Sequence, residues 1–236
     1  MFKVLKSKKM IRQSRAELTR LGCSVIENKL RRHARRFGIG IGLPIGDIVK
    51  SWDVLESIKF IDLNSKKEDY ILDLGSYCSE LPVSLAKMGF TNVHAVDLNP
   101  EVMCMPKLGT IKYTVSDFMA TPFEQGSFKV ITSISVIEHG YDPHRLFSEV
   151  ARLLSNGGHF LASFDYWPEK IDTSGIKFFD MDWLIFSNLD LKKMLAIAAS
   201  YGLTPVGEIQ NKAEEAAIHC LNYDYTFGWL VLRKVS

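Results

Sequence analysis

Three short acidic motifs in the middle of the chain have the residue types needed to bind a nucleoside. Gly75 follows Asp73 closely, and a glycine lets the backbone turn sharply and approach a ligand. Asp97 lies 24 residues after Asp73, at the place where a nucleotide-binding fold holds ribose hydroxyls. Asp117 offers an acceptor for an exocyclic amine beside the aromatic face of Phe118. Aspartate is also common in exposed turns, so each motif alone is weak evidence for a nucleoside site. The prediction of such a site depends on the three motifs occurring in this order.

The motifs follow strands in a pattern of alternating strands and helices. This alternation predicts an α/β fold: a doubly wound, seven-stranded, mostly parallel sheet with an antiparallel last strand, in a three-layer sandwich with an N-terminal helical extension. Ligands of such sheets bind at the carboxyl ends of the strands. The predicted strands are 70–74, 93–97, 111–115, 129–137, 159–164, 203–209 and 225–234. The predicted helices are 48–63, 79–88, a short one from Asn99-Pro100, 143–154 and 189–201.

The stretch ILDLGSYCSELPVSLA resembles the first motif of the class I S-adenosylmethionine-dependent methyltransferases. The order that follows over residues 117–161 also resembles this family: acid, Pro-Phe, Gly-Ser-Phe, apolar strand, Glu-His, helix, Gly-Gly and strand. The resemblance covers about residues 68–166 and implies S-adenosylmethionine as cofactor. It extends loosely to a branch that methylates glycans or small molecules. The cofactor-binding residues that it implies are Asp73, Gly75, Ser76, Tyr77, Asp97, Leu98, Asp117, Phe118 and Ser135.

The chain departs from the family pattern at three positions. Tyr77 and Ser79 stand where the family has its second and third glycines, and Lys129 replaces a frequent aspartate. Tyr77 must therefore point away from the methionine moiety or line the pocket, and Ser79 requires a negative φ. The missing glycines also argue against a dehydrogenase, because S-adenosylmethionine carries no pyrophosphate for them to approach.

The candidate catalytic residues follow the fourth and fifth predicted strands, 129–137 and 159–164. Methyl transfer needs mainly a near-attack geometry, and a general base only when the acceptor must lose a proton. His139 would take that proton near neutral pH, and Asp165 and Tyr166 are the other candidates. A structural role for the Glu138-His139 pair is equally open. No metal site is indicated, because the nearby acidic and histidine residues occupy one short turn.

An insertion at residues 165–188 looks like a lid over the acceptor. It contains five aromatic residues and three aspartates between Trp167 and Asn188, a combination that suits a sugar or another polyol. The alternative is that the aromatic side chains only pack under the end of the sheet.

The composition divides the chain into a basic beginning and an acidic remainder. The 236 residues are 47% hydrophobic and 24% charged, which excludes a disordered or fibrous protein. Residues 1–40 contain 12 Lys and Arg against two Glu, and the remainder has a net charge of −8. We therefore expect a basic helical extension or cap at 1–63 and a methyltransferase domain at 64–236, with 37–47 as a linker or substrate-facing loop. The four cysteines form no CxxC pair and are expected to be reduced thiols.

Several functions fit these observations. The first is methyl transfer to a small-molecule or glycan acceptor, at a hydroxyl oxygen. The alternatives are a non-catalytic methyltransferase-like binding module and a nucleic-acid methyltransferase that uses the basic segment. That segment would be a cap over the cofactor, a peripheral membrane tether or a nucleic-acid arm, in this order of preference. No secretory signal or membrane span is recognised, so we expect a cytoplasmic location.

Overall fold

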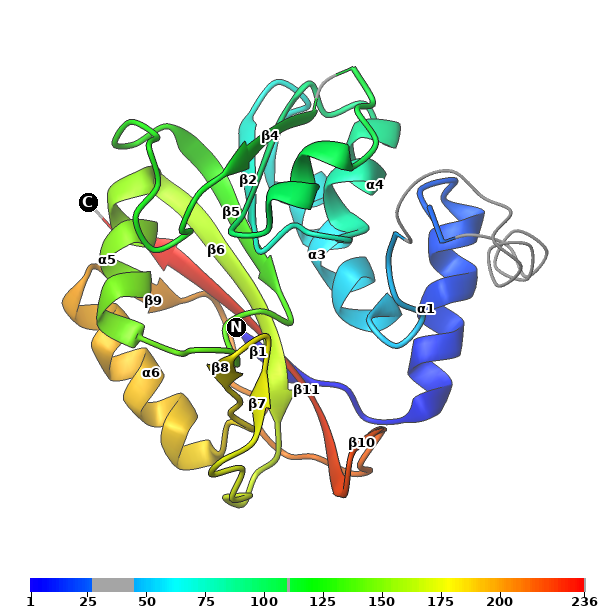
Figure 1. Ribbon diagram of the computed structural model, residues 1–236, viewed down its shortest axis with the longest axis vertical. Helices are drawn as coiled ribbons and strands as arrows, with labels where there is room; N and C mark the ends of the chain where they lie inside the picture. The colour runs from blue at the N-terminus through cyan, green and yellow to red at the C-terminus, as the bar shows by residue number, and fades with distance from the viewer. Residues whose placement is uncertain (27–44, 110, 236) are drawn as a thin grey trace.

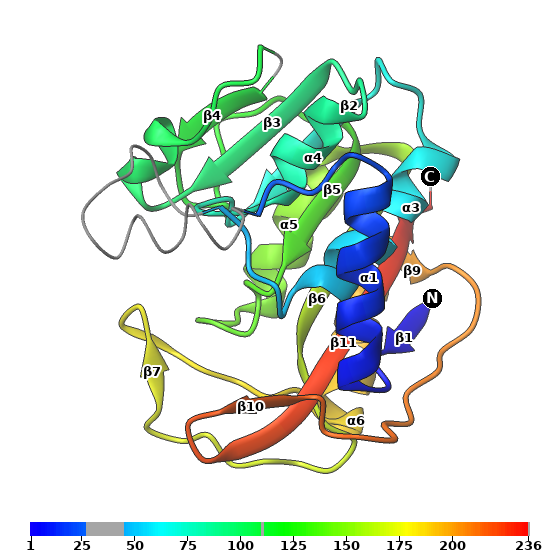
Figure 2. The same cartoon turned by 90° about the vertical axis from the view of Figure 1, so that its right-hand side faces the viewer.

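A twisted sheet runs through the molecule and carries helices on both faces (Figures 1 and 2). The computed structural model describes residues 1–26, 45–109 and 111–235. The strands are β1 (Phe2–Val4), β2 (Tyr70–Leu74), β3 (Asn92–Asp97), β4 (Ile111–Val115), β5 (Phe128–Ile134), β6 (Leu154–Tyr166), β7 (Lys177–Phe178), β8 (Met181–Asp182), β9 (Leu203–Pro205), β10 (Ile218–Cys220) and β11 (Tyr223–Lys234). The helices are α1 (Lys8–Arg20), α3 (Ser51–Asn64), α4 (Leu81–Lys87), the 3₁₀ helix η1 (Pro100–Cys104), α5 (Pro143–Leu153) and α6 (Asn188–Ser200).

The sheet has the predicted doubly wound topology. Its order is β1-β11-β6-β5-β2-β3-β4, and the pairs β6·β5, β5·β2, β2·β3 and β3·β4 are parallel. The last strand, β11, is antiparallel to β6 and to β9. The α/β fold and the antiparallel last strand are therefore confirmed. The carboxyl ends of β2, β3 and β4 lie at one edge, where parallel strands bring their following loops together.

Two short strands enlarge the sheet beyond the seven predicted strands. β10 forms a hairpin with the start of β11, and β1 pairs with β11 so that Phe2 lies opposite Leu230. A side chain at Gly228 would clash with the Phe2 ring, since a Cβ built there lies 2.6 Å from it. The segment expected to be a helical extension therefore begins with a strand, because residues 2–4 are part of the sheet. A strand of three residues is too short to show a period in the sequence.

Helices cover the two faces of the sheet with separate hydrophobic cores. α1, α3 and α4 lie on one face, and α5 and α6 on the other (Figure 1). Local signals set the helix starts: the Asp142 side chain accepts the Arg145 N–H before α5, and Ser187 and Asp190 form a capping box on α6. All four cysteines are free thiols, as expected. Among the described residues, no helix is long and apolar enough to cross a membrane.

Candidate active site

The loop after β2 is shaped by the buried carboxylate of Asp73. Its oxygens accept hydrogen bonds from the Thr132 hydroxyl at 2.6 Å and the Ser76 hydroxyl at 2.9 Å. Burial raises the pKa of Asp73 to about 6. Asp73 and Ser76 are 1% and 0% exposed, so their side chains hold the loop in shape. Their direct contact with the cofactor stays a prediction.

Gly75 is needed for packing as well as for the turn. Its φ is +71°, and a Cβ at this position would lie 2.5 Å from the Val136 side chain. The close approach expected at Gly75 is thus made by Val136, which follows β5, rather than by a ligand. The second positive φ of the loop falls on Cys78, at +59°, while Ser79 does not have a positive φ. The requirement placed on Ser79 is therefore met.

Asp97 is positioned at the tip of β3 by two backbone amides. One carboxylate oxygen accepts the Tyr77 N–H at 2.8 Å, and the other accepts the Asn99 N–H at 2.8 Å. The carboxylate is half-buried and keeps lone pairs free for further donors. The Tyr77 hydroxyl donates to Glu101 at 2.6 Å, which raises the pKa of Tyr77. Tyr77 thus points toward η1, consistent with the expectation that it avoids the methionine moiety.

Asp117 lies after β4 and is paired with a cation that the sequence interpretation did not include. One of its oxygens accepts the Met119 N–H at 2.8 Å, and the other is 2.6 Å from the Arg145 guanidinium at the start of α5. Leu98 is 56% exposed, and Phe118 is half-buried. Asp97, Leu98, Asp117 and Phe118 therefore follow adjacent strands and form the side of the site that suits a nucleoside.

Ser135, at the end of β5, faces a buried acidic group rather than the nucleoside side. Its φ is +51°, and its hydroxyl lies 3.4 Å from an Asp53 oxygen. Asp165 lies at the end of neighbouring β6, where the Trp183 indole N–H donates to it at 2.7 Å. Burial raises the pKa of Asp165 to about 7. Ser135 and Asp165 thus belong to the acceptor side of the site.

His139 is a weaker base than the sequence suggests. Burial, helped by the charge of Lys50, lowers the pKa of His139 to about 4. Its ring meets Phe178 and Phe179 edge-on, with centroids 5.7 and 5.6 Å away. A pKa this low makes His139 a weak base near neutral pH, and its catalytic role stays a prediction. Its aromatic contacts place it between the loop after β5 and the β7–β8 hairpin.

The structure does not bring Tyr166 into the site. Its side chain is 0% exposed and meets the Phe2 ring edge-on. Its hydroxyl lies 2.7 Å from both the Asn188 side chain and the Asn211 carbonyl. Successive residues of a strand point to opposite faces of a sheet, so Asp165 faces the core under α3 and Tyr166 the core under α6. Tyr166 is a core residue, which corrects its assignment as catalytic.

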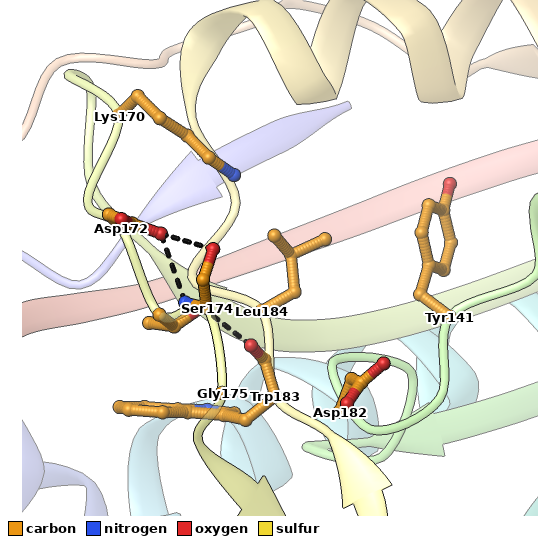
Figure 3. Close-up of a pocket in the computed structure, with 9 residues that line it drawn as sticks. Tyr141, Lys170, Asp172, Ser174, Gly175, Asp182, Trp183 and Leu184 are labelled. Atoms are coloured by element: carbon orange, nitrogen blue, oxygen red, sulfur yellow. Dashed lines mark hydrogen bonds between the residues drawn. The ribbon is translucent and has the colours of Figure 1, made fainter.

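The insertion folds into the β7–β8 hairpin and a loop that together line a cavity of about 470 Å³ (Figure 3). The hairpin turn is strained because Phe179 and Asp180 both have positive φ, at 56° and 63°. Asp172 is held in the cavity wall by the Ser174 N–H and hydroxyl, at 2.9 and 2.6 Å. The cavity is lined by Tyr141, Lys170, Asp172, Thr173, Ser174, Gly175, Asp182, Trp183 and Leu184.

The N-terminal segment contributes a buried ion pair that the sequence interpretation missed. Arg15 of α1 donates to both oxygens of Glu80, at 2.7 and 2.8 Å, and Glu80 precedes α4. A pattern of basic residues on a helix indicates only a polar face, so the partner could not be named in advance. Residues 27–44, which include most of the expected 37–47 loop, lie outside the described residues. In the described part of the chain, no three His, Cys, Asp or Glu side chains are placed to hold a metal ion.

The comparisons decide the family. Residues 72–162 match the family described as a methyltransferase domain, and this range includes the loop after β2, Asp97 and Asp117. The chain contains a class I methyltransferase domain. This confirms the resemblance, the Rossmann-like fold and S-adenosylmethionine as the cofactor of the family.

Curated relatives of the methyltransferase domain are proteins named ubiquinone biosynthesis O-methyltransferase. The one from Xanthomonas oryzae pv. oryzae is 32% identical over 106 residues, which are 42% of this chain and 44% of the relative. The one from Xanthomonas campestris pv. campestris is 30% identical over the same shares. The chain thus matches less than half the length of these curated relatives.

Solved structures share the fold at low identity. The [4+2]-cyclase SpnF has a TM-score of 0.64 and 12% identity, covering 80% of this chain and 84% of its own. Geranyl diphosphate C-methyltransferase from Streptomyces coelicolor A3(2), in complex with S-adenosyl-L-homocysteine, has a TM-score of 0.57 and 16% identity. It covers 82% of this chain and 86% of its own. These likenesses concern the fold alone.

The residues of the methyltransferase domain fit S-adenosylmethionine. The Asp97 carboxylate is fixed by two backbone amides yet remains half-buried, so it can accept both ribose hydroxyls. Asp117 and the exposed Leu98 follow neighbouring strands and suit an adenine ring. The side chains of Tyr77 and Ser79 do not prevent this fit, because Tyr77 reaches Glu101 and the Ser79 backbone is unstrained.

Proposed function

We propose that the chain is an enzyme that transfers a methyl group from S-adenosylmethionine to a hydroxyl oxygen of a small-molecule or glycan acceptor. The observation that carries the proposal is the fixed carboxylate of Asp97, within a segment that matches the methyltransferase family. The proposal extends the family assignment, which covers residues 72–162, to the activity of the whole chain.

Binding and orientation account for most of the proposed mechanism. S-adenosylmethionine supplies a methyl group on a positively charged sulfur, which is open to in-line attack. Asp97 would hold the ribose hydroxyls, and Asp117 would accept from the adenine amine while Arg145 fixes its second oxygen. The acceptor would be held from the insertion side, so that its oxygen reaches the methyl group in line. Such positioning supplies much of the rate acceleration in a displacement.

The lining of the insertion cavity supports a polyol or another hydroxyl-rich acceptor. Hydroxyls, carboxylates and a lysine surround it, and Trp183 lies in its wall. Carboxylates accept hydrogen bonds from sugar hydroxyls, while aromatic faces cover their CH groups. The name O-methyltransferase of the curated relatives adds support for oxygen as the acceptor atom.

We propose that the basic N-terminal segment is part of a cap rather than a membrane tether or a nucleic-acid arm. Three of its cations pair with acidic residues later in the chain: Lys3 with Glu56 of α3, and Lys6 with Glu214 and Arg15 with Glu80 of the methyltransferase domain. These charges are thereby less available to lipid or phosphate. Deleting residues 1–36 should therefore abolish S-adenosylhomocysteine binding by disturbing the fold, whereas a pure tether would leave that affinity unchanged.

Calorimetric titration with S-adenosylhomocysteine tests the proposed function. An enzyme should bind this product with a Kd in the micromolar range or below, equivalent to about −8 kcal/mol. Methyl transfer would then be measured with radiolabelled S-adenosylmethionine against a panel of phenols, sugars and nucleic acids. No binding heat would favour the non-catalytic module, and transfer to nucleic acid alone would replace the glycan or small-molecule acceptor.

A further inference from the structure

Three buried acidic side chains from distant parts of the chain interact electrostatically under the insertion. Asp53 comes from α3, Glu138 from the loop after β5 and Asp165 from the end of β6, and they are 0%, 1% and 6% exposed. The Ser163 hydroxyl donates to Asp53 at 2.7 Å, and the Trp183 indole donates to Asp165 at 2.7 Å. We call these three residues the acidic triad.

Not every carboxylate oxygen of the acidic triad has a hydrogen-bond partner, as Glu138 shows. Its Oε2 atom is buried and has no hydrogen-bond partner among the described residues. The charges of Asp165 and Asp53 both raise the pKa of Glu138, so its carboxyl faces them closely enough to interact. A buried carboxylate without a donor is costly, which agrees with a pKa of Glu138 well above its usual range.

The groups packed around Asp165 leave it as the member that exchanges a proton. Burial and the charge of Asp53 raise its pKa, while Trp183, Lys50 and the Tyr225 hydroxyl lower it, and the net pKa is about 7. Burial raises the pKa of Asp53 to about 6. Of the two aspartates, Asp165 has the pKa closer to neutral pH. A base whose pKa is close to the working pH is the most effective kind.

The acidic triad lies beside the insertion cavity, because Trp183 lines the cavity and also donates to Asp165. β5 and β6 are adjacent and parallel, and their carboxyl ends carry Glu138 and Asp165. Leu184 of the insertion donates its N–H to the Glu138 carbonyl at 2.9 Å, and Trp183 covers Asp165. His139, the base suggested by the sequence, is neutral throughout this pH range.

We propose that Asp165, held near Asp53 and Glu138, takes the proton that the acceptor hydroxyl loses during methyl transfer. The O–H bond breaks, and its proton binds a carboxylate oxygen of Asp165. The electron pair left on the acceptor oxygen forms the bond to the methyl carbon, and the carbon–sulfur pair stays on sulfur. The proton passes to water when the product leaves. This inference rests on the proposed function and restricts the acceptor to a group that carries a removable proton.

Trp183 provides a test that does not depend on activity. Its indole donates to Asp165, so its fluorescence should change when Asp165 ionises. The protein has four tryptophans, and subtracting the emission of Trp183→Phe isolates this signal. We expect one titration step with a midpoint near pH 7 that is absent in Asp165→Asn. Asp53→Asn should lower the midpoint, and Lys50→Met should raise it.

The matched control is Asp182→Asn. Asp182 directly precedes Trp183, but its side chain is 83% exposed, so this change should leave the midpoint unaltered. A step that survives in Asp165→Asn, or a midpoint insensitive to both Asp53→Asn and Lys50→Met, would overturn the proposal.

The kinetic test uses methyl transfer to catechol or to glucose, with S-adenosylhomocysteine affinity measured in parallel. Asp165→Asn should lower kcat about 100-fold or more and remove the acidic limb of its pH profile, while the affinity stays within twofold. Asp165→Glu should restore part of the rate. Unchanged kcat in Asp165→Asn refutes the inference, whereas absent S-adenosylhomocysteine binding in the wild type refutes the proposed function. If neither acceptor reacts, the fluorescence titration decides.

Discussion

The ion pair between Arg15 and Glu80 allows a quantitative prediction about the N-terminal segment. Arg15 makes two parallel bonds to the Glu80 carboxylate, and Val25 donates its N–H to the same group at 3.0 Å. The side chains are 15% and 1% exposed, respectively. Replacing Arg15 with alanine would leave the Glu80 charge buried with one neutral donor.

We expect Arg15→Ala to lower the free energy of unfolding by about 3–5 kcal/mol, because a broken buried pair leaves an uncompensated charge. For a chain of this size, that loss corresponds to a fall in Tm of roughly 6–20 °C. Equilibrium unfolding in urea and a thermal melt would measure it. If removal of the charge is the cause, the double variant Arg15→Met, Glu80→Leu should recover most of the loss.

Arg20→Ala is the matched control on the same helix. Arg20 pairs with Glu17 one turn earlier, but its side chain is 70% exposed, so the change should cost at most about 0.5 kcal/mol. If Arg15→Ala proves no more harmful than Arg20→Ala, the N-terminal segment is not fastened to the body through Glu80. The argument for an integral cap would then fail.

Four further predictions concern the site and the insertion. Asp97→Ala should weaken S-adenosylhomocysteine binding by about 1.5–3 kcal/mol, measured by calorimetry, since a charged acceptor for two hydroxyls is lost; unchanged affinity would refute the assignment of β3. Asp117→Ala should cost about 1 kcal/mol and reduce discrimination between the adenosine and inosine forms of the cofactor product; equal losses for both would make Asp117 structural. The pKa of Asp73 is raised from 3.8 to about 6, so the folded state binds its proton more tightly than the unfolded state. Relative to Asp73→Asn, the wild type should therefore gain up to roughly 3 kcal/mol of stability as pH falls from 7 to 4 in urea titrations, and a pH-independent difference would contradict this. Asp180→Gly should raise the free energy of unfolding by about 1 kcal/mol because it relieves a positive φ in the hairpin turn; Asp182→Gly, where φ is not positive, should not.

The sequence predicted the sheet well because its signals are local. Runs such as YILDL and NVHAVD carry enough apolar residues to mark buried strands, and the intervening helices have clear stops at glycine. The positions of Asp97 and Asp117 followed directly, since each lies at a strand end. β1 was not predicted because three residues are too few to show a hydrophobic period. Its position also depends on the absence of a side chain at Gly228, which is distant in the sequence.

Only the tertiary structure decided which of the candidate side chains face a ligand. Asp73 and Ser76 have the expected residue types and spacing, yet burial turns them into supports of the loop. Asp165 and Tyr166 are neighbours in sequence, but successive side chains of a strand point to opposite faces of the sheet. Asp165 therefore belongs to the acidic triad, and Tyr166 lies in the core on the other face. Asp53 accepts a hydrogen bond from Ser163 across 110 residues, and Arg15 pairs with Glu80 across 65. Such pairings depend on the packing of whole elements and on the desolvation that this packing causes, which residue type and spacing do not encode.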